Sequence, residues 1–239
     1  MGSQFGTDGS SYHFATNFGH KITKLYPSLV QMKCDGVAVK GLKGIKQKAL
    51  VSLYDGNKLI KKTIGDLLFT DNGVSGNAIF YLSSYLVDLS NPNLVADLLP
   101  DIETDKIINS LQNKIKVYPN ITGDKLLNGI VASRLSTKIS TELGINNIKL
   151  SEIANAKLVV AIQKIKEYRL PIVGTMGFNN AQVTRGGINT KDIDNQTYES
   201  KLVKGLYIVG EALDVDGDCG GYNLQFAFSS AMCASEAIK

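Results

Sequence analysis

The spacing of apolar residues changes several times along the 239-residue chain. Near its start, Tyr12, Ala15 and Phe18 recur every three residues after a loop rich in glycine and serine, which predicts a short helix. Gly19 suits the left-handed position that ends such a helix. A globular domain seldom opens with a glycine loop that leads into a helix with no strand before it. We therefore expect the chain to begin inside a larger fold.

Between about residues 29 and 89 apolar residues alternate with polar ones, as Ala49, Val51 and Leu53 do, and Asp55-Gly56 is a strong hairpin signal. This pattern predicts a small antiparallel sheet. Lysines crowd the same region, at positions 40, 43, 46, 48, 58, 61 and 62. These lysines would either line an anion-binding surface or solvate the exposed face of the sheet, where they would also discourage edge pairing. We favour the solvated face, because no aromatic residues are interleaved with the lysines.

From about residue 101 to 167 apolar residues recur at helical spacing, and Ser151 is predicted to cap one of the helices. Strands are predicted again after Pro171, the last of them a buried strand over residues 205–209. This strand leads into Gly210-Glu211, an acidic glycine loop, and a helix from about Tyr222 to Ile238. The order of elements predicts an α/β protein, α+β in this portion, whose Rossmann-like domain is partial and holds two inserted subdomains.

Charge and cysteine content narrow the class of protein. Lysine and arginine number 26 and aspartate and glutamate 22, so the net charge is only +4. Few of the cations are arginine, which speaks against a nucleic-acid partner. Three distant cysteines support neither a disulfide framework nor a structural zinc site. No apolar run approaches the length of a membrane span, so we expect a cytoplasmic protein with no membrane partner.

The chemically informative segment lies near the carboxyl end of the chain. A buried strand that ends in Gly210-Glu211 would place a carboxylate at the carboxyl edge of a sheet, where open α/β folds bind ligands. Gly220-Gly221 would let the backbone approach a ligand, and the next helix would direct its free N–H groups the same way. These features suit a molecule that has both hydroxyl groups and an electron-rich edge, such as the ribityl chain and isoalloxazine ring of a flavin.

The sequence gives less support to a metal site, a reactive cysteine or a hydrolase. Asp214, Asp216 and Asp218 alternate like part of a calcium loop, but the glutamate that ends such a loop is missing, so we predict no metal site. Cys219 beside the helix start has no second cysteine nearby. Ser75 lies outside a nucleophile elbow, which disfavours a hydrolase. No residue is assigned as catalytic.

Five separated segments resemble the bacterial NAD(P)/FAD-dependent oxidoreductases of the BaiN/RdsA-like flavoprotein family. They are residues 68–76 (LFTDNGVSG), 181–188 (AQVTRGGI), 199–201 (ESK) with 205–207 (GLY), 210–217 (GEALDVDG) and 220–225 (GGYNLQ), and they occur in the family order. The resemblance implies a partial FAD-binding domain at residues 1–28 and 170–239, a β-barrel-like insert at residues 29–95, and a helical insert at residues 96–169.

The resemblance also implies the residues that bind the cofactor. Gly210 and Glu211 resemble the ribityl-binding turn, and Gly186 and Gly187 resemble a loop that passes close to the ring. The loop and helix start that face the flavin would consist of Gly220, Gly221, Tyr222, Asn223, Leu224 and Gln225. The cofactors implied are FAD and NAD(P)H.

The chain departs from the family pattern because no Gly-x-Gly-x-x-Gly occurs in it, so roughly the first third of such a protein is absent. We therefore expect a truncated C-terminal portion of an FAD-dependent oxidoreductase, which in full would transfer hydride between NAD(P)H, flavin and a small organic substrate. Alone, the chain is expected to bind FAD weakly or not at all and to be inactive. The alternative is a non-catalytic fragment or substrate-capping module without flavin. The edge of the sheet at residues 206–209 could pair in a homodimer.

Overall fold

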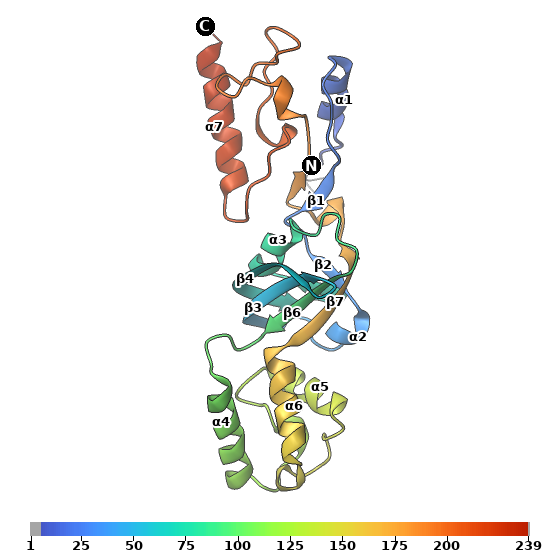
Figure 1. Ribbon diagram of the computed structural model, residues 1–239, viewed down its shortest axis with the longest axis vertical. Helices are drawn as coiled ribbons and strands as arrows, with labels where there is room; N and C mark the ends of the chain where they lie inside the picture. The colour runs from blue at the N-terminus through green and yellow to red at the C-terminus, as the bar shows by residue number, and fades with distance from the viewer. Residues whose placement is uncertain (1–5, 239) are drawn as a thin grey trace. The chain divides into compact units, whose positions relative to one another are not determined.

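A computed structural model describes residues 6–238 of the chain (Figure 1). The chain divides into two compact units. The first consists of the described residues up to Met32, of Ile79–Asp88, and of the described residues from Gly174 onward; the second consists of Lys33–Ala78 and Leu89–Val173. The three-part division expected from the sequence stays a prediction, and most of its β-rich and helical parts fall in the second unit.

The first unit contains little regular sheet. Its elements are α1 (Ser10–Asn17), β1 (Tyr26–Ser28), β8 (Val183–Arg185), the short 3₁₀ turns η4 (Phe178–Asn180), η5 (Thr190–Asp192) and η6 (Gly210–Ala212), and the long helix α7 (Tyr222–Ala237). β1 and β8 pair antiparallel, with Pro27 opposite Thr184. A small core surrounds Tyr12 and Ala15 of α1, together with Ile188, Ile193, Ile208 and Leu213. The predicted first and last helices are therefore confirmed.

The second unit is built on a closed barrel. Its strands are β2 (Met32–Cys34), β3 (Lys46–Asp55), β4 (Lys58–Phe69), β5 (Gly73–Ser75), β6 (Pro92–Asp97) and β7 (Tyr168–Thr175), in the order β2-β5-β4-β3-β6-β7. The short helix α2 (Gly36–Val39) follows β2, and α3 (Asn77–Ser83) follows β5 and belongs mostly to the first unit. β3 and β4 form the predicted hairpin, and Gly56 takes the positive φ of 58° that its turn requires.

Apolar and polar residues alternate along β3, and this alternation places one row of side chains inside the barrel. Ala49, Val51 and Leu53 are fully buried and point into the barrel, while the residues between them face outward. Three of the seven lysines in this region form exposed ion pairs, namely Lys43 with Asp71, Lys46 with Asp66, and Lys48 with Asp101. Part of the lysine charge is therefore neutralised locally.

The rest of the second unit is helical, as predicted. It contains α4 (Thr104–Val117), η2 (Gly123–Lys125), α5 (Ser133–Glu142), η3 (Leu150–Glu152) and α6 (Asn155–Lys166). Ile107 and Leu111 of α4 and Leu135 and Ile139 of α5 are buried at three- or four-residue spacing. Together with the barrel, these helices confirm the predicted mixed α/β class.

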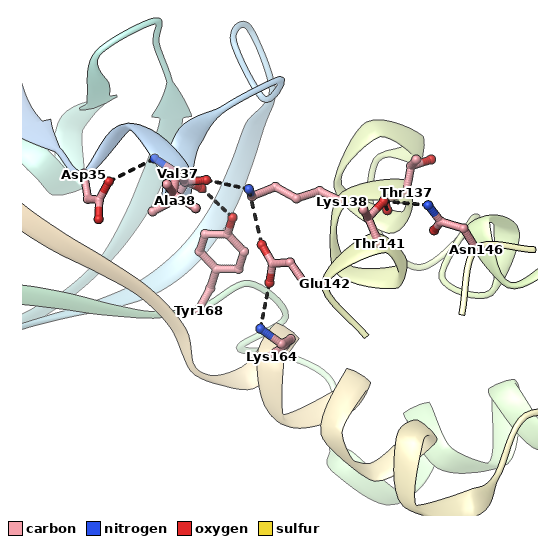
Figure 2. A network of polar contacts seen from close by, with 10 residues as sticks. All are labelled: Asp35, Val37, Ala38, Thr137, Lys138, Thr141, Glu142, Asn146, Lys164 and Tyr168. Atoms are coloured by element: carbon pink, nitrogen blue, oxygen red, sulfur yellow. Dashed lines mark hydrogen bonds and ion pairs between the residues drawn. The ribbon is translucent and has the colours of Figure 1, made fainter. Parts of the chain in front are cut away.

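A polar network links α5 to α2 and α6 (Figure 2). Lys138 Nζ donates to the Val37 carbonyl oxygen at 2.6 Å and lies 3.2 Å from Glu142 Oε1. The second carboxylate oxygen, Glu142 Oε2, accepts from Lys164 Nζ of α6 at 2.7 Å. One carboxylate thus connects two helices, and through Lys138 it is joined to α2.

Tyr168 at the start of β7 adds a second link to α2. Its hydroxyl donates to the Ala38 carbonyl oxygen at 2.7 Å (Figure 2). Its ring also meets that of Phe69 edge to face. Burial is the main reason why the pKa of Tyr168 is raised, with Glu142 adding to the effect. The phenol therefore stays a hydrogen-bond donor at ordinary pH.

Two sequence predictions about local structure are wrong. Ser151 does not cap a helix, because it lies inside η3, and α6 starts at Asn155 after Ala154. Leu150 is buried and its amide donates to the Ile121 carbonyl oxygen, while the Ile153 amide donates to the Leu150 carbonyl oxygen and closes the 3₁₀ turn. Residues 205–209 form a single bridge between Tyr207 and Glu199 instead of a strand. The Ser200 amide donates to the Leu206 carbonyl oxygen and the Ile208 amide to the Tyr198 carbonyl oxygen, so residues 198–200 do pair with this segment, but only over one antiparallel bridge, which is too short for a strand.

The Glu142 network predicts a measurable loss of stability. Glu142→Gln is expected to lower the free energy of unfolding by about 1 kcal/mol, because it removes the negative partner of two lysines, one of them largely buried. Burial alone would raise the pKa of Glu142, but Lys164 and Lys138 outweigh it and lower the pKa below 4.5. Stability from the network is therefore present above pH 4.5 and is lost as the pH falls below this value.

Denaturant titrations at several pH values check this prediction. Asp71→Asn is the control, because the Lys43–Asp71 ion pair is exposed on both sides and is expected to contribute about 0.5 kcal/mol or less. Equal losses in the two variants would show that the Glu142 network adds nothing beyond a surface ion pair.

Candidate functional site

The site predicted from the sequence lies within the first unit, and α7 forms one of its sides. Gly221 precedes α7 with φ 93° and Gly220 has φ 134°, so both glycines adopt backbone conformations that other residues rarely take. No side chain among residues 6–238 caps the helix, so in this part of the chain its first N–H groups have no side-chain cap. The start of α7 therefore has the donors and the positive dipole end that suit an electron-rich group.

Asn223 fixes the acidic glycine loop onto the first turn of α7. Its Nδ2 donates to the Gly217 carbonyl oxygen at 2.9 Å, and its Oδ1 accepts from the Gly217 amide at 2.8 Å. A Cβ at Gly217 would lie 2.9 Å from Tyr222 Cβ, so the loop passes very close to the helix. The side chain of Asn223 therefore supports the loop, and the sequence prediction that it binds the cofactor is untested.

The turn that carries Glu211 packs on the same face of α7 as Asn223. The Gly210 amide donates to Ser230 Oγ at 3.0 Å, and a Cβ at Gly210 would lie 3.4 Å from Ala227 Cβ. Because Asn223, Ala227 and Ser230 are four and three residues apart, they share one face of the helix. The structure therefore brings Gly210 and Asn223 to one side of α7.

Glu211 connects this turn to β8. Its Oε1 accepts from the Thr184 amide at 2.8 Å, and its side chain is half-buried. Tyr12 of α1 is buried, and its pKa is raised to about 12 by burial first and by the charges of Glu211 and Asp214 next. Glu211 thus lies where α1, β8 and η6 meet.

Gly186 and Gly187 are required by close backbone contacts. A Cβ at Gly186, which has φ 89°, would lie 2.2 Å from the Lys24 carbonyl oxygen. A Cβ at Gly187 would lie 2.7 Å from the Leu213 carbonyl carbon and oxygen. The loop after β8 therefore lies between two other backbone segments, one of which directly follows Glu211 and Ala212.

A polar cluster that the sequence prediction missed lies beside this loop. Ser28 Oγ is 2.8 Å from Ser84 Oγ and donates to Asp216 Oδ2 at 3.4 Å, while Arg185 donates to the Ser84 carbonyl oxygen at 2.6 Å. Burial is the main cause of a raised pKa of Asp216; Arg185 and Ser28 oppose it. Asp216 and Arg185 stand in segments that the sequence singles out, but Ser28 and Ser84 carry no local signal.

The remaining predicted residues at the start of α7 are largely exposed or hydrogen-bonded within the helix. Tyr222 and Leu224 are 64% and 69% exposed, and Gln225 donates through Nε2 to Ser229 Oγ at 3.0 Å. None of the hydrogen bonds described for these side chains reaches Glu211. The roles expected for these residues stay predictions.

Metal ligands and membrane-spanning helices are two other features that the described residues could hold. Among residues 6–238, no three histidine, cysteine, aspartate or glutamate side chains are grouped as metal ligands. None of the helices in that range is long and apolar enough to cross a bilayer.

Comparison with known proteins identifies the family. Residues 2–237 match the HI0933-like protein Rossmann domain. The chain belongs to the HI0933-like family. The kinship with BaiN/RdsA-like flavoproteins expected from the sequence is thereby confirmed.

Two kinds of named relative are found within this similarity. The 3-dehydro-bile acid delta(4,6)-reductase of Clostridium scindens is 32% identical over 237 residues, which cover 97% of this chain and 58% of the relative. The ribosomal RNA dihydrouridine synthases of Escherichia coli and Haemophilus influenzae are 29% and 30% identical, with 98% and 95% of this chain covered. These alignments span 57% and 55% of the two synthases, so the chain spans less than three-fifths of the relatives' length.

The residues around Glu211 fit the hydroxylated part of a flavin. Two buried hydroxyl oxygens, Tyr12 Oη and Thr184 Oγ1, have no hydrogen-bond partner in the described part of the chain. Glu211 uses one carboxylate oxygen for the Thr184 amide, and no hydrogen bond is described for the other. A carboxylate oxygen without a partner can accept hydrogen bonds from the hydroxyl groups of a ligand.

The close contact at Gly186 predicts a large penalty for a small side chain. Gly186→Ala is expected to lower the free energy of unfolding by about 1–3 kcal/mol more than Gly205→Ala, because the added methyl group would overlap the Lys24 carbonyl. Gly205 is the matched control, since it has a similar φ of 82° but open space around its Cβ position. Thermal and denaturant unfolding check the difference, and equal penalties would contradict the tight packing of the loop.

Proposed function

We propose that the chain is the C-terminal portion of a flavin-dependent reductase that saturates a carbon–carbon double bond conjugated to a carbonyl group. The observation that carries this proposal is the alignment of nearly the whole chain with a reductase. In this chain, contacts of Thr184 and Gly210 hold Glu211 beside α7. The names of both kinds of relative describe the same chemistry, because dihydrouridine is uridine with a saturated ring double bond. A conjugated enone and a uracil ring are both activated in this way.

The proposed cofactor is FAD, and NADH or NADPH is the proposed reductant. Glu211 would hold the ribityl chain, and the backbone at Gly186, Gly187, Gly220 and Gly221 would approach the ring. When bound, the flavin would accept a hydride from the nicotinamide and deliver it to the substrate carbon, and a proton would complete the saturation.

The residues of the chain would then orient the cofactor and stabilise charge. Negative charge on a reduced flavin near the start of α7 would be stabilised by about 0.3–1 kcal/mol, and more if the site is dry. Asp216, whose pKa is raised mainly by burial, is suited to keep a proton at higher pH than an ordinary aspartate. These roles need no further group from the second unit.

The complete activity would also need residues outside this chain. The alignments leave more than two-fifths of each relative unmatched, and the sequence has no glycine-rich turn to hold a pyrophosphate. We propose that an N-terminal portion supplies this turn. The isolated chain is therefore expected to bind FAD weakly and to be inactive.

Adding the portion of the Clostridium scindens relative that the chain does not match, fused before Met1, tests the proposal. The fusion protein is expected to hold FAD and to consume NADH or NADPH with an enone substrate, whereas the chain alone holds little FAD. Glu211→Gln should weaken FAD binding about tenfold, because glutamine can still accept from the Thr184 amide but carries no charge.

Flavin absorbance and fluorescence titration measure these effects, with Glu236→Gln on the exposed side of α7 as the control. Stoichiometric FAD on the chain alone would overturn the need for a second portion. A folded fusion protein that takes no flavin would overturn the proposed function.

A second candidate is that the substrate is a uracil ring within RNA. Two relatives are named for ribosomal RNA, and the second unit has a groove of about 430 Å³ between the α2 end and α5. Three cations, Lys40, Arg134 and Lys138, line this groove, and Glu142 is its one carboxylate. Phosphate groups would suit such a lining.

Salt-dependent RNA binding separates the two substrate classes. If RNA is the substrate, the affinity should fall steeply with salt, and Arg134→Gln should reduce the logarithmic salt slope by about 0.7–1. Arg169→Gln is the control, because Arg169 lies on β7 outside this groove. No RNA binding at low salt would remove this candidate and leave the small-molecule substrate that the charge balance predicts.

A further inference from the structure

One side of α7 is apolar and exposed to solvent. Leu224, Phe228 and Met232 follow one another at four-residue spacing, so they form a single row along the helix, which we call the α7 row. They are 69%, 74% and 65% exposed. Glu236 is the one charged residue of this 16-residue helix. A helix that is apolar on several sides is normally buried, so the composition of α7 is that of a helix covered on more than one side.

The first unit itself covers a different side of α7. Ser230 Oγ accepts from the Gly210 amide at 3.0 Å, Asn223 holds Gly217 through two hydrogen bonds, and Ala234 is 5% exposed. Successive residues of an α-helix are turned by about 100°, so the α7 row, which begins one residue after Asn223, lies on another side of the helix. The contacts within the unit therefore leave the row uncovered.

A second helix of the same unit shows the same arrangement. Tyr12 and Ala15 of α1 are buried in a core that also packs against Phe226 of α7. Phe14 is nevertheless 67% exposed, and Phe18, just past the end of α1, is 49% exposed. Single exposed apolar side chains are common in soluble proteins, whereas contiguous apolar rows mark interaction surfaces. Two helices that pack against one core thus each expose apolar side chains.

The family of the chain indicates what covers such helices. A Rossmann domain, which residues 2–237 match, is an open and mostly parallel sheet with helices on both faces. The sheet that the described residues form in the first unit consists of β1 and β8, which are short and antiparallel. Parallel strands are nearly continuous runs of valine, isoleucine and leucine, and helices bury both faces of the sheet that they form. The apolar side of α7 suits one of these faces.

The length of the relatives leaves room for such a sheet. The alignments leave more than two-fifths of each relative unmatched. Two copies of this chain paired through α7 would also bury the α7 row, but they would supply no parallel sheet. The observations therefore favour the unmatched portion over a second copy as the partner.

We propose that the α7 row docks against one face of a parallel β-sheet that belongs to the N-terminal portion of the complete protein. The partner surface is a sheet face rich in valine, isoleucine and leucine. This inference rests on the proposed function in one respect, because it takes the same N-terminal portion as the partner. It needs no bound flavin, so the two proposals can be tested separately.

Thiol labelling at the centre of the row tests the docking. Phe228→Cys is made in the fusion protein and in the 239-residue chain alone, and Cys219→Ser and Cys233→Ser remove the two native thiols that are not buried. Val37→Cys is the matched control, because Val37 is 72% exposed and lies in the second unit. Mass spectrometry measures the labelling rates without flavin.

The two positions should differ only in the fusion protein. In the chain alone, the thiols of Phe228→Cys and Val37→Cys should react at similar rates. In the fusion protein, Phe228→Cys should react more slowly by about tenfold or more, because a docked sheet must first open, while Val37→Cys should be unchanged.

Thermal unfolding gives a second readout. Phe228→Glu should lower the Tm of the fusion protein, because it buries a carboxylate without a partner, and should not lower the Tm of the chain alone. Val37→Glu should change neither value.

Each result decides for or against the docking surface. Fast labelling of Phe228→Cys in the fusion protein, or an unchanged Tm of the Phe228→Glu fusion protein, would overturn the proposal. Slow labelling in the chain alone that becomes faster on dilution would identify a second copy as the partner and would overturn it as well. A fusion protein that protects the thiol but takes no flavin would overturn the proposed function alone, and one that takes flavin with a reactive thiol would overturn the docking alone.

Discussion

The arrangement of the candidate site depends on one close backbone contact, where residues 185–187 lie between two other segments of the first unit. The Thr23 amide donates to the Gly187 carbonyl at 2.8 Å on one side, and the Ile188 amide donates to the Ala212 carbonyl at 2.8 Å on the other. Only glycine leaves room for both contacts. This contact sets β8 against the turn that carries Glu211, so the carboxylate, the Thr184 amide and the Tyr12 phenol all depend on it.

The same constraint separates scaffold residues from binding residues. Asn223 and Gly210, both expected to bind the cofactor, use their polar groups within the fold, on Gly217 and Ser230. Their contribution is to fix the acidic loop and the Glu211 turn against α7. Groups that remain available in the described part of the chain are the N–H groups at the start of α7 and one oxygen of Glu211. A motif therefore identifies the place of a site better than it identifies the atoms that bind.

Local signals in the sequence predicted the elements that depend on near neighbours. The Asp55-Gly56 hairpin and the first and last helices follow from turn residues and from apolar spacing, and all are present. The strand expected at residues 205–209 is reduced to one bridge, because its antiparallel pairing with residues 198–200 extends no further. Tyr12 was predicted as an apolar position of a helix, and its burial confirms this. Its hydroxyl has no partner among the described residues, and the charges that act on it come from residues some 200 positions away. No local pattern encodes these surroundings.

The outer face of α7 connects the folding of the chain to its proposed chemistry. Leu224, Phe228 and Met232 follow one another at four-residue spacing and are 69%, 74% and 65% exposed. Burying each such side chain contributes about 1.5–3 kcal/mol, so this face leaves a large stabilisation unused. In the proposed complete protein, the N-terminal portion that holds the pyrophosphate would also cover this face. Cofactor binding and burial of α7 would then stabilise each other, because both favour the same assembled state over the separate chain. The weak flavin binding proposed for the chain alone and the exposed apolar face of α7 would then have one physical cause.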